Sequence, residues 1–161
     1  MSRREELSHD ATHQIRDTCL CVRVQRAARA LARHFDDALR DAGLTHGQFS
    51  LLVALSHDAP PTLGEVSAAL AMDRTTLTAN LKPLARRGLV KVAVDKADKR
   101  SRRLIITAAG RGRLNAAFPA WKAAHAELDA TLGLARVDRL RADLKTIAEP
   151  RVAAAEKAAA E

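Results

Sequence analysis

The sequence predicts a mainly helical protein of the α+β class with one short two-stranded hairpin. Of the 161 residues, 47% are hydrophobic and only 2% are aromatic, with just 7 Gly and 5 Pro. This composition favours helices over a β-sandwich or barrel. Signals that start helices recur along the chain, and two β-like segments flank a single charged tip. Together these observations indicate a helical frame that carries one hairpin.

The first half of the chain predicts a long helix followed by a short one. Residues 13–41 are expected to be a single helix, because apolar residues recur at three- and four-residue steps. These are Val24, Ala28, Leu31 and Phe35. Gly43 is expected to end this helix. The spacing of Thr45 and Gln48 is that of a capping box, which predicts an apolar helix over residues 49–55.

Two further helices follow, separated by a tight turn. Thr62 and Glu65 have capping-box spacing and open a helix that ends near residue 70. Residues 71–72 form the turn. Asp73 is a favourable N-cap for the next helix, which runs to residue 87, and Gly88 is placed for a left-handed C-terminal cap.

The hairpin is predicted from residues 89–94 and 102–106, which are β-like and flank the charged tip 95–101. Thr107 then caps a helix through about residue 132, and a last helix spans about residues 135–149. The tail, residues 151–161, has helical composition but no apolar stripe to bury. Two helices joined by a turn and followed by a hairpin form a winged helix-turn-helix, which places one helix in a DNA major groove and a loop beside it.

Charge is concentrated in this part of the chain. Residues 73–113 hold 12 Lys or Arg and 3 Asp or Glu, a net charge of +9, whereas the whole chain has a net charge of +8. The remaining residues hold 15 basic and 16 acidic side chains, a net charge of −1. A basic segment that coincides with the predicted DNA-reading elements favours a nucleic-acid partner over a merely solvated surface.

On a helical wheel, Leu77, Leu81 and Leu84 share one face of the helix and are expected to face the core. The outward surface starts with small residues and becomes cationic, which suits base contacts followed by phosphate contacts. The residues expected to bind DNA are Arg74, Thr75, Thr76, Thr78, Ala79, Lys82 and Arg86 on the helix and Lys99, Arg100 and Arg102 at the hairpin. Asp98 is expected to orient Arg100 through a carboxylate–guanidinium pair.

Three stretches of the sequence resemble the MarR family of bacterial transcription regulators. They are residues 71–78 (AMDRTTLT), residues 84–90 (LARRGLV), and the segment from Asp95 through Asp98 and Arg100 to residues 104–110 (LIITAAG). The likeness covers roughly residues 15–147. It implies an obligate homodimer that binds double-stranded DNA at a pseudo-palindromic operator, usually represses a neighbouring gene, and releases DNA in response to a small molecule or oxidant.

The resemblance also implies a domain organisation and roles for individual residues. Residues 12–45 and 108–150 would form helical dimerisation regions, and residues 46–107 the winged helix-turn-helix. Arg100 would enter the minor groove, while Thr75, Thr76, Thr78 and Lys82 would lie at the major groove. Many family members carry Arg at the position of Ala79. Alanine cannot make a bidentate base contact, so operator sequences cannot be carried over.

Two cysteines and two other residues are candidates for a regulatory site. Cys21 resembles the reactive-cysteine position of the peroxide-sensing branch of the family, although this chain has no Tyr to surround it. Nearby arginines can lower a thiol pKa, so redox sensing at Cys19 and Cys21 stands beside inert packing as an interpretation. Within one helix these two side chains would point about 200° apart, which makes a disulfide between them unfavourable. His46 and Arg16 are candidates to line an effector pocket, and a small organic anion is compatible with such a pocket.

Other classes of function receive less support. The sequence contains no nucleophile elbow, phosphate loop or dinucleotide fingerprint, so we expect neither an enzyme nor a bound cofactor. We also expect no metal site. No apolar run approaches the ~20 residues that span a bilayer, and residues 1–10 lack the apolar centre of a signal peptide. A cytoplasmic regulator is therefore expected, and a non-specific architectural DNA-binding protein is the alternative.

Overall fold

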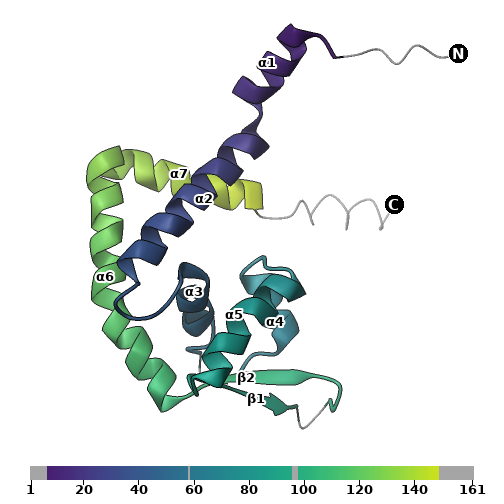
Figure 1. The fold of residues 1–161 in the computed structure, drawn as a ribbon, viewed down its shortest axis with the longest axis vertical. Coiled ribbons are helices and arrows are strands. Elements are labelled where there is room, and N and C mark those ends of the chain that lie inside the picture. The colour runs from purple at the N-terminus through teal and green to yellow at the C-terminus, as the bar shows by residue number, and fades with distance from the viewer. Residues whose placement is uncertain (1–6, 58, 96–97, 149–161) are drawn as a thin grey trace, which may run out of the picture. The chain divides into compact units, whose positions relative to one another are not determined.

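The computed structural model describes residues 7–57, 59–95 and 98–148. Its elements (Figure 1) are α1 (His9–Thr18), α2 (Leu20–Ala38), α3 (His46–Ala54), α4 (Leu63–Ala69), α5 (Arg74–Arg86), β1 (Val90–Val94), β2 (Arg102–Ile106), α6 (Ala108–Leu132) and α7 (Leu134–Ala148). The described chain is mainly helical and has a two-stranded sheet, as the sequence predicts. The predicted tail, residues 151–161, lies outside the described residues.

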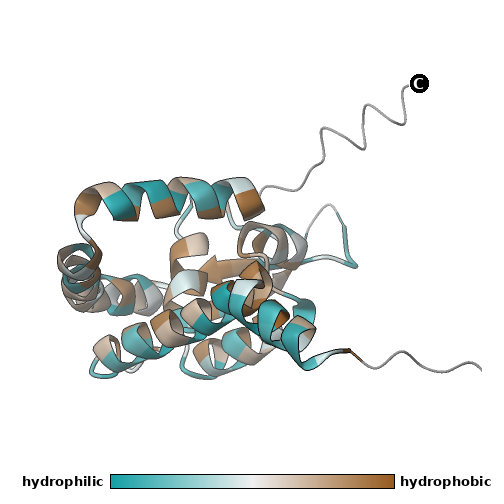
Figure 2. Cartoon of the chain, turned by 90° about the horizontal axis from the view of Figure 1, so that it is seen from above, coloured by the Kyte–Doolittle hydropathy of each residue, from teal (hydrophilic) through white to brown (hydrophobic). Residues whose placement is uncertain are grey.

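One prediction about the helices is wrong, because the single helix expected over residues 13–41 is two helices. α1 starts before the predicted position, since the Ser8 side chain accepts a hydrogen bond from the Ala11 amide. Cys19 has φ −65° and ψ 109°, an extended conformation that ends α1 and precedes α2. Cys19 is neither Gly nor Pro, so no local breaker marks this position in the sequence. α1 has no buried residues and is largely hydrophilic (Figure 2).

The next three helices begin at the capping residues that the sequence predicts. Thr45 and Thr62 both form complete capping boxes, with Gln48 and Glu65 respectively. Asp73 caps α5 by accepting a backbone hydrogen bond of 2.8 Å. Each cap satisfies an amide that has no partner within its helix, so these three side chains fix where the helices start.

The hairpin and the start of α6 are closely joined. β1 and β2 pair antiparallel, with Val90 opposite Ile106 at the open end. Thr107 caps α6 by accepting a hydrogen bond of 3.0 Å from the Gly110 amide. A Cβ atom on Gly110 would lie 2.2 Å from the Leu89 carbonyl oxygen, a distance that real side chains do not adopt. Glycine at this position therefore allows α6 to begin directly against the hairpin.

The hydrophobic core lies among α3, α5 and the hairpin. α3 packs against α2, α4 and α5, while α4 packs against β2 and α5 against β1 (Figure 1). The inward face of α5 is the one that the helical wheel predicts, and its three leucines are buried. The largest fully buried side chains are Leu39, Leu51, Leu52, Leu55, Val66, Leu77, Leu84 and Leu104.

The chain divides into two compact units, residues 1–121 and 122–161. In the second unit the end of α6 turns into α7 at Gly133, which has a φ of +82°. Arg141 of α7 contacts Asp138 at 3.0 Å and Asp129 at 3.5 Å. Val137 is buried in this unit.

Candidate nucleic-acid interface

A tight turn at Ala71 and Met72 joins α4 to α5. Ala71 has a φ of +48°, in the left-handed region that residues other than Gly rarely adopt. Two reciprocal hydrogen bonds hold the turn. The Ser67 hydroxyl donates to the Met72 carbonyl at 2.5 Å, and the Met72 amide donates to the Ser67 carbonyl at 3.0 Å. These bonds set the direction in which α5 follows α4.

The outward side of α5 carries all seven of the residues that the sequence predicts to bind DNA. Each of them is exposed, and Arg86 lies in the last turn of the helix. They are Arg74, Thr75, Thr76, Thr78, Ala79, Lys82 and Arg86. After Arg74, the surface presents hydroxyl and methyl groups and then ammonium and guanidinium groups, an order that matches base edges followed by phosphates.

Two of the threonines also have a structural role in α5. The Thr76 hydroxyl donates to the Asp73 carboxylate at 2.7 Å and completes the N-terminal cap. The Thr78 hydroxyl donates to the Arg74 carbonyl at 2.7 Å, one turn earlier in the helix. Each hydroxyl oxygen still has lone pairs that can accept a hydrogen bond from a base, whereas its proton is already engaged.

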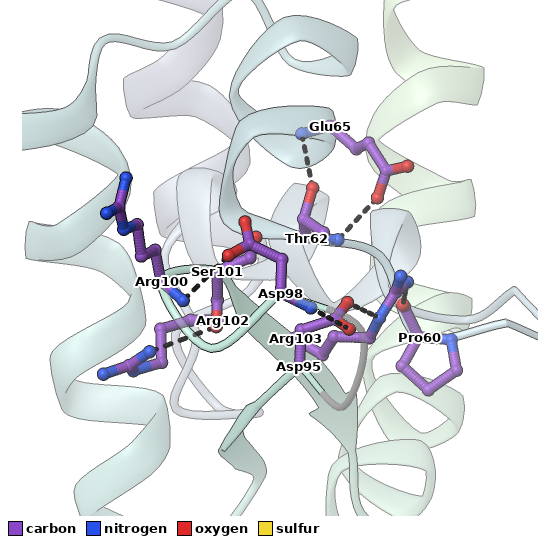
Figure 3. Close-up of polar contacts among 9 residues, drawn as sticks. All are labelled: Pro60, Thr62, Glu65, Asp95, Asp98, Arg100, Ser101, Arg102 and Arg103. Atoms are coloured by element: carbon purple, nitrogen blue, oxygen red, sulfur yellow. Dashed lines mark hydrogen bonds and ion pairs between the residues drawn. The ribbon is translucent and has the colours of Figure 1, made fainter.

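The predicted wing, which we define as residues 94–103, contains a β-turn over residues 98–101 that is closed by Asp98. Its carboxylate accepts the Arg100 amide at 2.9 Å, and its carbonyl accepts the Ser101 amide at 2.9 Å. The expected pair between Asp98 and the Arg100 guanidinium is not among the ion pairs of the described residues, and the Arg100 side chain points away from that carboxylate (Figure 3). Asp98 therefore orients Arg100 through the backbone, which corrects the sequence-based expectation.

Lys99, Arg100 and Arg102 are all exposed on the wing, in keeping with their predicted role. The Arg102 guanidinium donates to the carbonyls of Lys99 and Ser101 at 3.0 and 3.1 Å. These bonds hold the Arg102 side chain along the turn. The wing therefore presents three cationic side chains next to one another at its tip.

Asp95 and Arg103 form an ion pair that the sequence did not indicate. Asp95 is the buried charged residue of this region, at 6% exposure, and its carboxylate accepts Arg103 Nε at 2.5 Å. A second Arg103 nitrogen donates to the Pro60 carbonyl at 2.7 Å (Figure 3). The only hint in the sequence is that the hairpin register places residue 95 beside residues 101–103, whereas Pro60 is 43 positions away.

Other arginines of the basic segment also contact the protein itself. Arg87, at the end of α5, donates to the Gly43 carbonyl at 2.6 Å. Arg113 of α6 donates to the Ala42 carbonyl at 3.2 Å. Both bonds connect the basic segment to the α2–α3 connection. Part of the charge excess in residues 73–113 therefore stabilises the fold.

Helix capping lowers the pKa of two carboxyl groups beside this surface. The backbone amide of Thr76 lowers the pKa of Asp73, and the backbone amide of Thr62 lowers the pKa of Glu65. In both cases hydrogen bonds favour the charged form of the carboxyl group. The two caps are therefore ionised at neutral pH.

The candidate regulatory residues have separate surroundings. Cys21 is exposed, and Cys19 is half-buried at the junction of α1 and α2. Arg16 pairs with Asp17 at 2.8 Å on exposed α1. The His46 ring lies 5.6 Å from that of Phe35, and its backbone amide donates to the Asp36 carboxylate at 2.6 Å. Cys19 lies outside both helices, so the two cysteines do not share one helix, contrary to the sequence-based prediction, and both thiols are free.

Histidine spacing also gives no metal centre in the part of the chain that the structure describes. His9 and His13 are one turn apart on α1, and their rings stack at 5.8 Å. Two imidazoles have the H-x-x-x-H spacing, but a structural zinc site takes four ligands. Among the described residues, no group of three or more His, Cys, Asp or Glu side chains could hold a metal ion.

An apolar cavity lies between α3 and the first half of α6. One part of it, of about 280 Å³, is lined by Phe49, Val53, Leu114, Asn115, Phe118 and Trp121. Phe49 and Phe118 both stack near-parallel on Trp121, with ring centroids 6.0 and 5.7 Å apart. An adjoining part, of about 380 Å³, adds Ser50, Ala54, His57, Ala69 and Leu70. Neither part is lined by His46 or Arg16.

Comparisons of sequence agree with this geometry. The MarR family model matches residues 42–101. The HTH-type transcriptional regulator TtmR of Methylorubrum extorquens (strain PA1) is 34% identical over 96 residues, which are 60% of this chain and 49% of TtmR. The chain thus spans about half the length of that relative. No helix in the described ranges is long and apolar enough to cross a membrane.

Solved structures are similar over most of the chain. The M. tuberculosis transcriptional regulator MosR, solved in complex with DNA, is 39% identical over 84% of this chain and 98% of its own, with a TM-score of 0.74. The repressor CouR of Rhodococcus jostii RHA1, solved on a 23-mer DNA duplex, is 28% identical over 89% of this chain and 99% of its own, with a TM-score of 0.74. CouR has also been solved with p-coumaroyl-CoA. The chain therefore belongs to the MarR family of DNA-binding transcriptional regulators.

Proposed function

We propose that this chain is a sequence-specific repressor that acts in the cytoplasm as a homodimer on a pseudo-palindromic operator. The observation that carries the proposal is that α5, whose outward face is exposed, packs against β1 of the hairpin that carries the cationic wing. MosR and CouR, which are similar in structure, were solved with DNA, and CouR is a repressor. A two-fold symmetric dimer would match a pseudo-palindromic site.

In this proposal the α5 residues read the major groove and the wing reaches the minor groove. Thr75, Thr76, Thr78 and Ala79 contact base edges, and Arg74, Lys82 and Arg86 contact phosphates. Arg100 enters the minor groove, with Lys99 and Arg102 on the flanking phosphates. Because Ala79 carries only a methyl group, it can touch a thymine but cannot read a guanine.

Exposed apolar side chains on two helices support dimerisation. Leu20, Val24 and Leu31 share one face of α2, and Leu140, Leu144 and Ile147 share one face of α7. Contiguous apolar faces of this kind mark interaction surfaces. We propose that residues 12–45 and 108–150 form the dimerisation region, and residues 46–107 the DNA-binding domain.

Fluorescence anisotropy tests the specificity. The protein is titrated onto labelled DNA from upstream of its own gene, with unlabelled random DNA as competitor at raised salt. Specific binding leaves the complex intact at a large excess of competitor, because specific sites are typically 10³–10⁷-fold tighter than random ones. Equal competition by random DNA would instead support a non-specific architectural protein.

A small-molecule effector would act through the aromatic cavity between α3 and α6. The chain has only four aromatic residues, one Trp and three Phe, and Phe49, Phe118 and Trp121 all line this cavity. An effector releases DNA only if it prefers one spacing of the two recognition helices, which must lie about 34 Å apart for successive major grooves. Benzoate, a planar organic anion, is a suitable first probe, because quenching of Trp121 reports its entry. Unchanged emission at millimolar benzoate would contradict this choice of ligand.

An oxidant is the second regulatory input, and the exposure of Cys21 favours it. Peroxide would convert the Cys21 thiol to a sulfenic acid and release one water molecule. The anisotropy titration is therefore repeated after mild peroxide treatment, with Cys19→Ser and Cys21→Ser variants alongside. Release that Cys21→Ser prevents supports oxidant sensing, whereas binding that is indifferent to peroxide assigns both cysteines to packing.

A further inference from the structure

The base of the wing is tied to the segment that leads into α4. Arg103 uses two different nitrogens of its guanidinium, Nε on the Asp95 carboxylate at 2.5 Å and a terminal nitrogen on the Pro60 carbonyl at 2.7 Å. Two backbone interactions run beside it. The Leu104 amide donates to the Pro61 carbonyl at 2.8 Å, and Thr62 forms an isolated antiparallel bridge with Arg103. β2 therefore pairs with β1 on one edge and with residues 61–62 on the other.

The ion pair at the centre of this contact is buried on its acidic side. The Asp95 side chain is 7% exposed and that of Arg103 is 40% exposed. A buried carboxylate is costly to leave unpaired, so the wing is held in the position in which Asp95 meets Arg103. The Asp95 carboxylate also accepts a hydrogen bond of 3.3 Å from the Asp98 amide (Figure 3). This bond links the position of Asp95 to the turn that presents Arg100.

The same contact reaches the helix pair on its other side. Thr62, which bridges Arg103, is the N-cap of α4, and its capping box with Glu65 fixes the first turn of that helix. α4 is in turn joined to α5 by the hydrogen-bonded turn at residues 71–72. A continuous set of named contacts thus leads from Arg103 to the helix that is proposed to read the major groove.

We propose that Arg103 is a positioning residue, which locks the wing to the start of α4 so that Arg100 is held at a fixed place relative to α5. Arg103 itself does not contact DNA in this account, because its guanidinium is directed to Asp95 and Pro60. The inference rests on the proposed function, since it assumes that Arg100 reads the minor groove. A lysine cannot replace Arg103, because one ammonium lacks the planar fork that serves two acceptors in different directions.

The experiment uses a DNA duplex selected from a random pool by the wild-type protein. Two versions keep the selected half-sites and differ only in the base pairs under the wings, which are A·T-rich in one and G·C-rich in the other. A third version has scrambled half-sites. Narrow A·T-rich minor grooves attract arginine, so the wild type is expected to prefer the A·T version by on the order of tenfold.

Arg103→Lys and Arg103→Gln are expected to reduce this flank preference to less than about twofold, while the preference for selected over scrambled half-sites remains. Arg113→Lys is the matched control, because Arg113 also donates to a distant backbone carbonyl but lies outside the wing and the proposed DNA contacts, and it is expected to keep the flank preference. Hydrogen exchange of a peptide spanning the wing, measured on the free protein, is expected to be faster in Arg103→Lys than in Arg113→Lys. This second readout does not depend on DNA.

Several outcomes would overturn the proposal. If Arg103→Lys keeps the flank preference, the planar guanidinium of Arg103 is not needed to position the wing. If Arg103→Lys weakens binding to all three duplexes by one common factor, Arg103 contributes only to the folded fraction. Arg100→Gln separates these failures from a failure of the proposed function. A flank preference that survives Arg100→Gln shows that Arg100 does not read the minor groove, whereas loss in Arg100→Gln with retention in both Arg103 variants overturns the positioning role alone.

Discussion

Among single residues, hydrogen-bond partners decide which basic side chains are available to DNA. Lys82 and Arg86 lie on the exposed face of α5, whereas Arg87, the next residue, donates to the Gly43 carbonyl. Arg103 is likewise directed to Asp95 and Pro60 rather than away from the protein. A count of charges along the sequence cannot make this distinction, because the Gly43 and Pro60 carbonyls lie far away in the chain from the arginines that they bind.

The close approach of α6 to the hairpin leads to a prediction for a pair of glycines. Gly110→Ala would place a Cβ 2.2 Å from the Leu89 carbonyl oxygen, so unfolding free energy should fall by about 1–3 kcal/mol. Gly112→Ala, two residues later in the same helix, meets no atom within 4 Å and should raise it by about 0.5–1 kcal/mol. Urea unfolding at one fixed protein concentration measures both. Equal effects of the two substitutions would contradict the close approach.

The two capping carboxylates predict how stability depends on pH. Asp73 and Glu65 have pKa values lowered by the backbone amides of Thr76 and Thr62. A lowered folded-state pKa gives a stabilising contribution that is present above the unfolded value of about 4 and is lost as the pH falls through the folded value. The thermal midpoint should therefore drop between about pH 4 and the lower folded-state pKa values.

Asp73→Asn provides the control for this effect. Asn can still cap α5 but cannot ionise, so the variant should lose less of its thermal midpoint than the wild type over the same acid range. Circular dichroism melts at a series of pH values give the comparison. An equal acid loss in both proteins would show that Asp73 does not contribute to the pH dependence.

For whole elements, local sequence signals predict where a helix starts better than where a helix is interrupted. Thr45, Thr62 and Asp73 cap helices as expected, because an N-cap and its partner lie three residues apart and are visible in sequence. The break at Cys19 was missed, since it has neither a Gly nor a side-chain cap, and the apolar residues that predicted the helix all lie after it. The sequence predicted that Asp98 binds the guanidinium of Arg100, whereas Asp98 binds the backbone amide of Arg100.

Substitutions of neighbouring basic residues on α5 and at its end should differ in their effects on DNA binding and on stability, depending on whether the side chain faces outward. Lys82→Gln and Arg86→Gln should each lower the slope of log K against log salt by about 1 and leave stability unchanged, because each removes a phosphate contact. Arg87→Gln should keep the slope and lower the unfolding free energy by about 1 kcal/mol, because it removes a hydrogen bond to the Gly43 carbonyl. DNA titrations at several salt concentrations, together with urea unfolding, separate the two effects. A reduced slope in Arg87→Gln would contradict the assignment.

For the whole molecule, the architecture could be predicted and the long-range contacts could not. The order of helices, turn and hairpin was sufficient to predict the winged helix-turn-helix. The contact of Arg103 with Pro60 joins residues 43 positions apart, and that of Arg113 with Ala42 joins residues 71 apart. No periodicity or spacing links such pairs, because they meet only when the helices and the hairpin pack together. The aromatic cavity has the same origin, since its rings come from α3 and α6.

In the proposed complex, two copies of α5 read successive major grooves while the wings reach the flanking minor grooves. Methylation protection on the selected duplex tests it most directly, because dimethyl sulfate reports guanine N7 in the major groove and adenine N3 in the minor groove. We predict two patches of guanine N7 protection about 10 base pairs apart, with adenine N3 protection outside them. A single protected patch, or uniform protection along the duplex, would contradict the account.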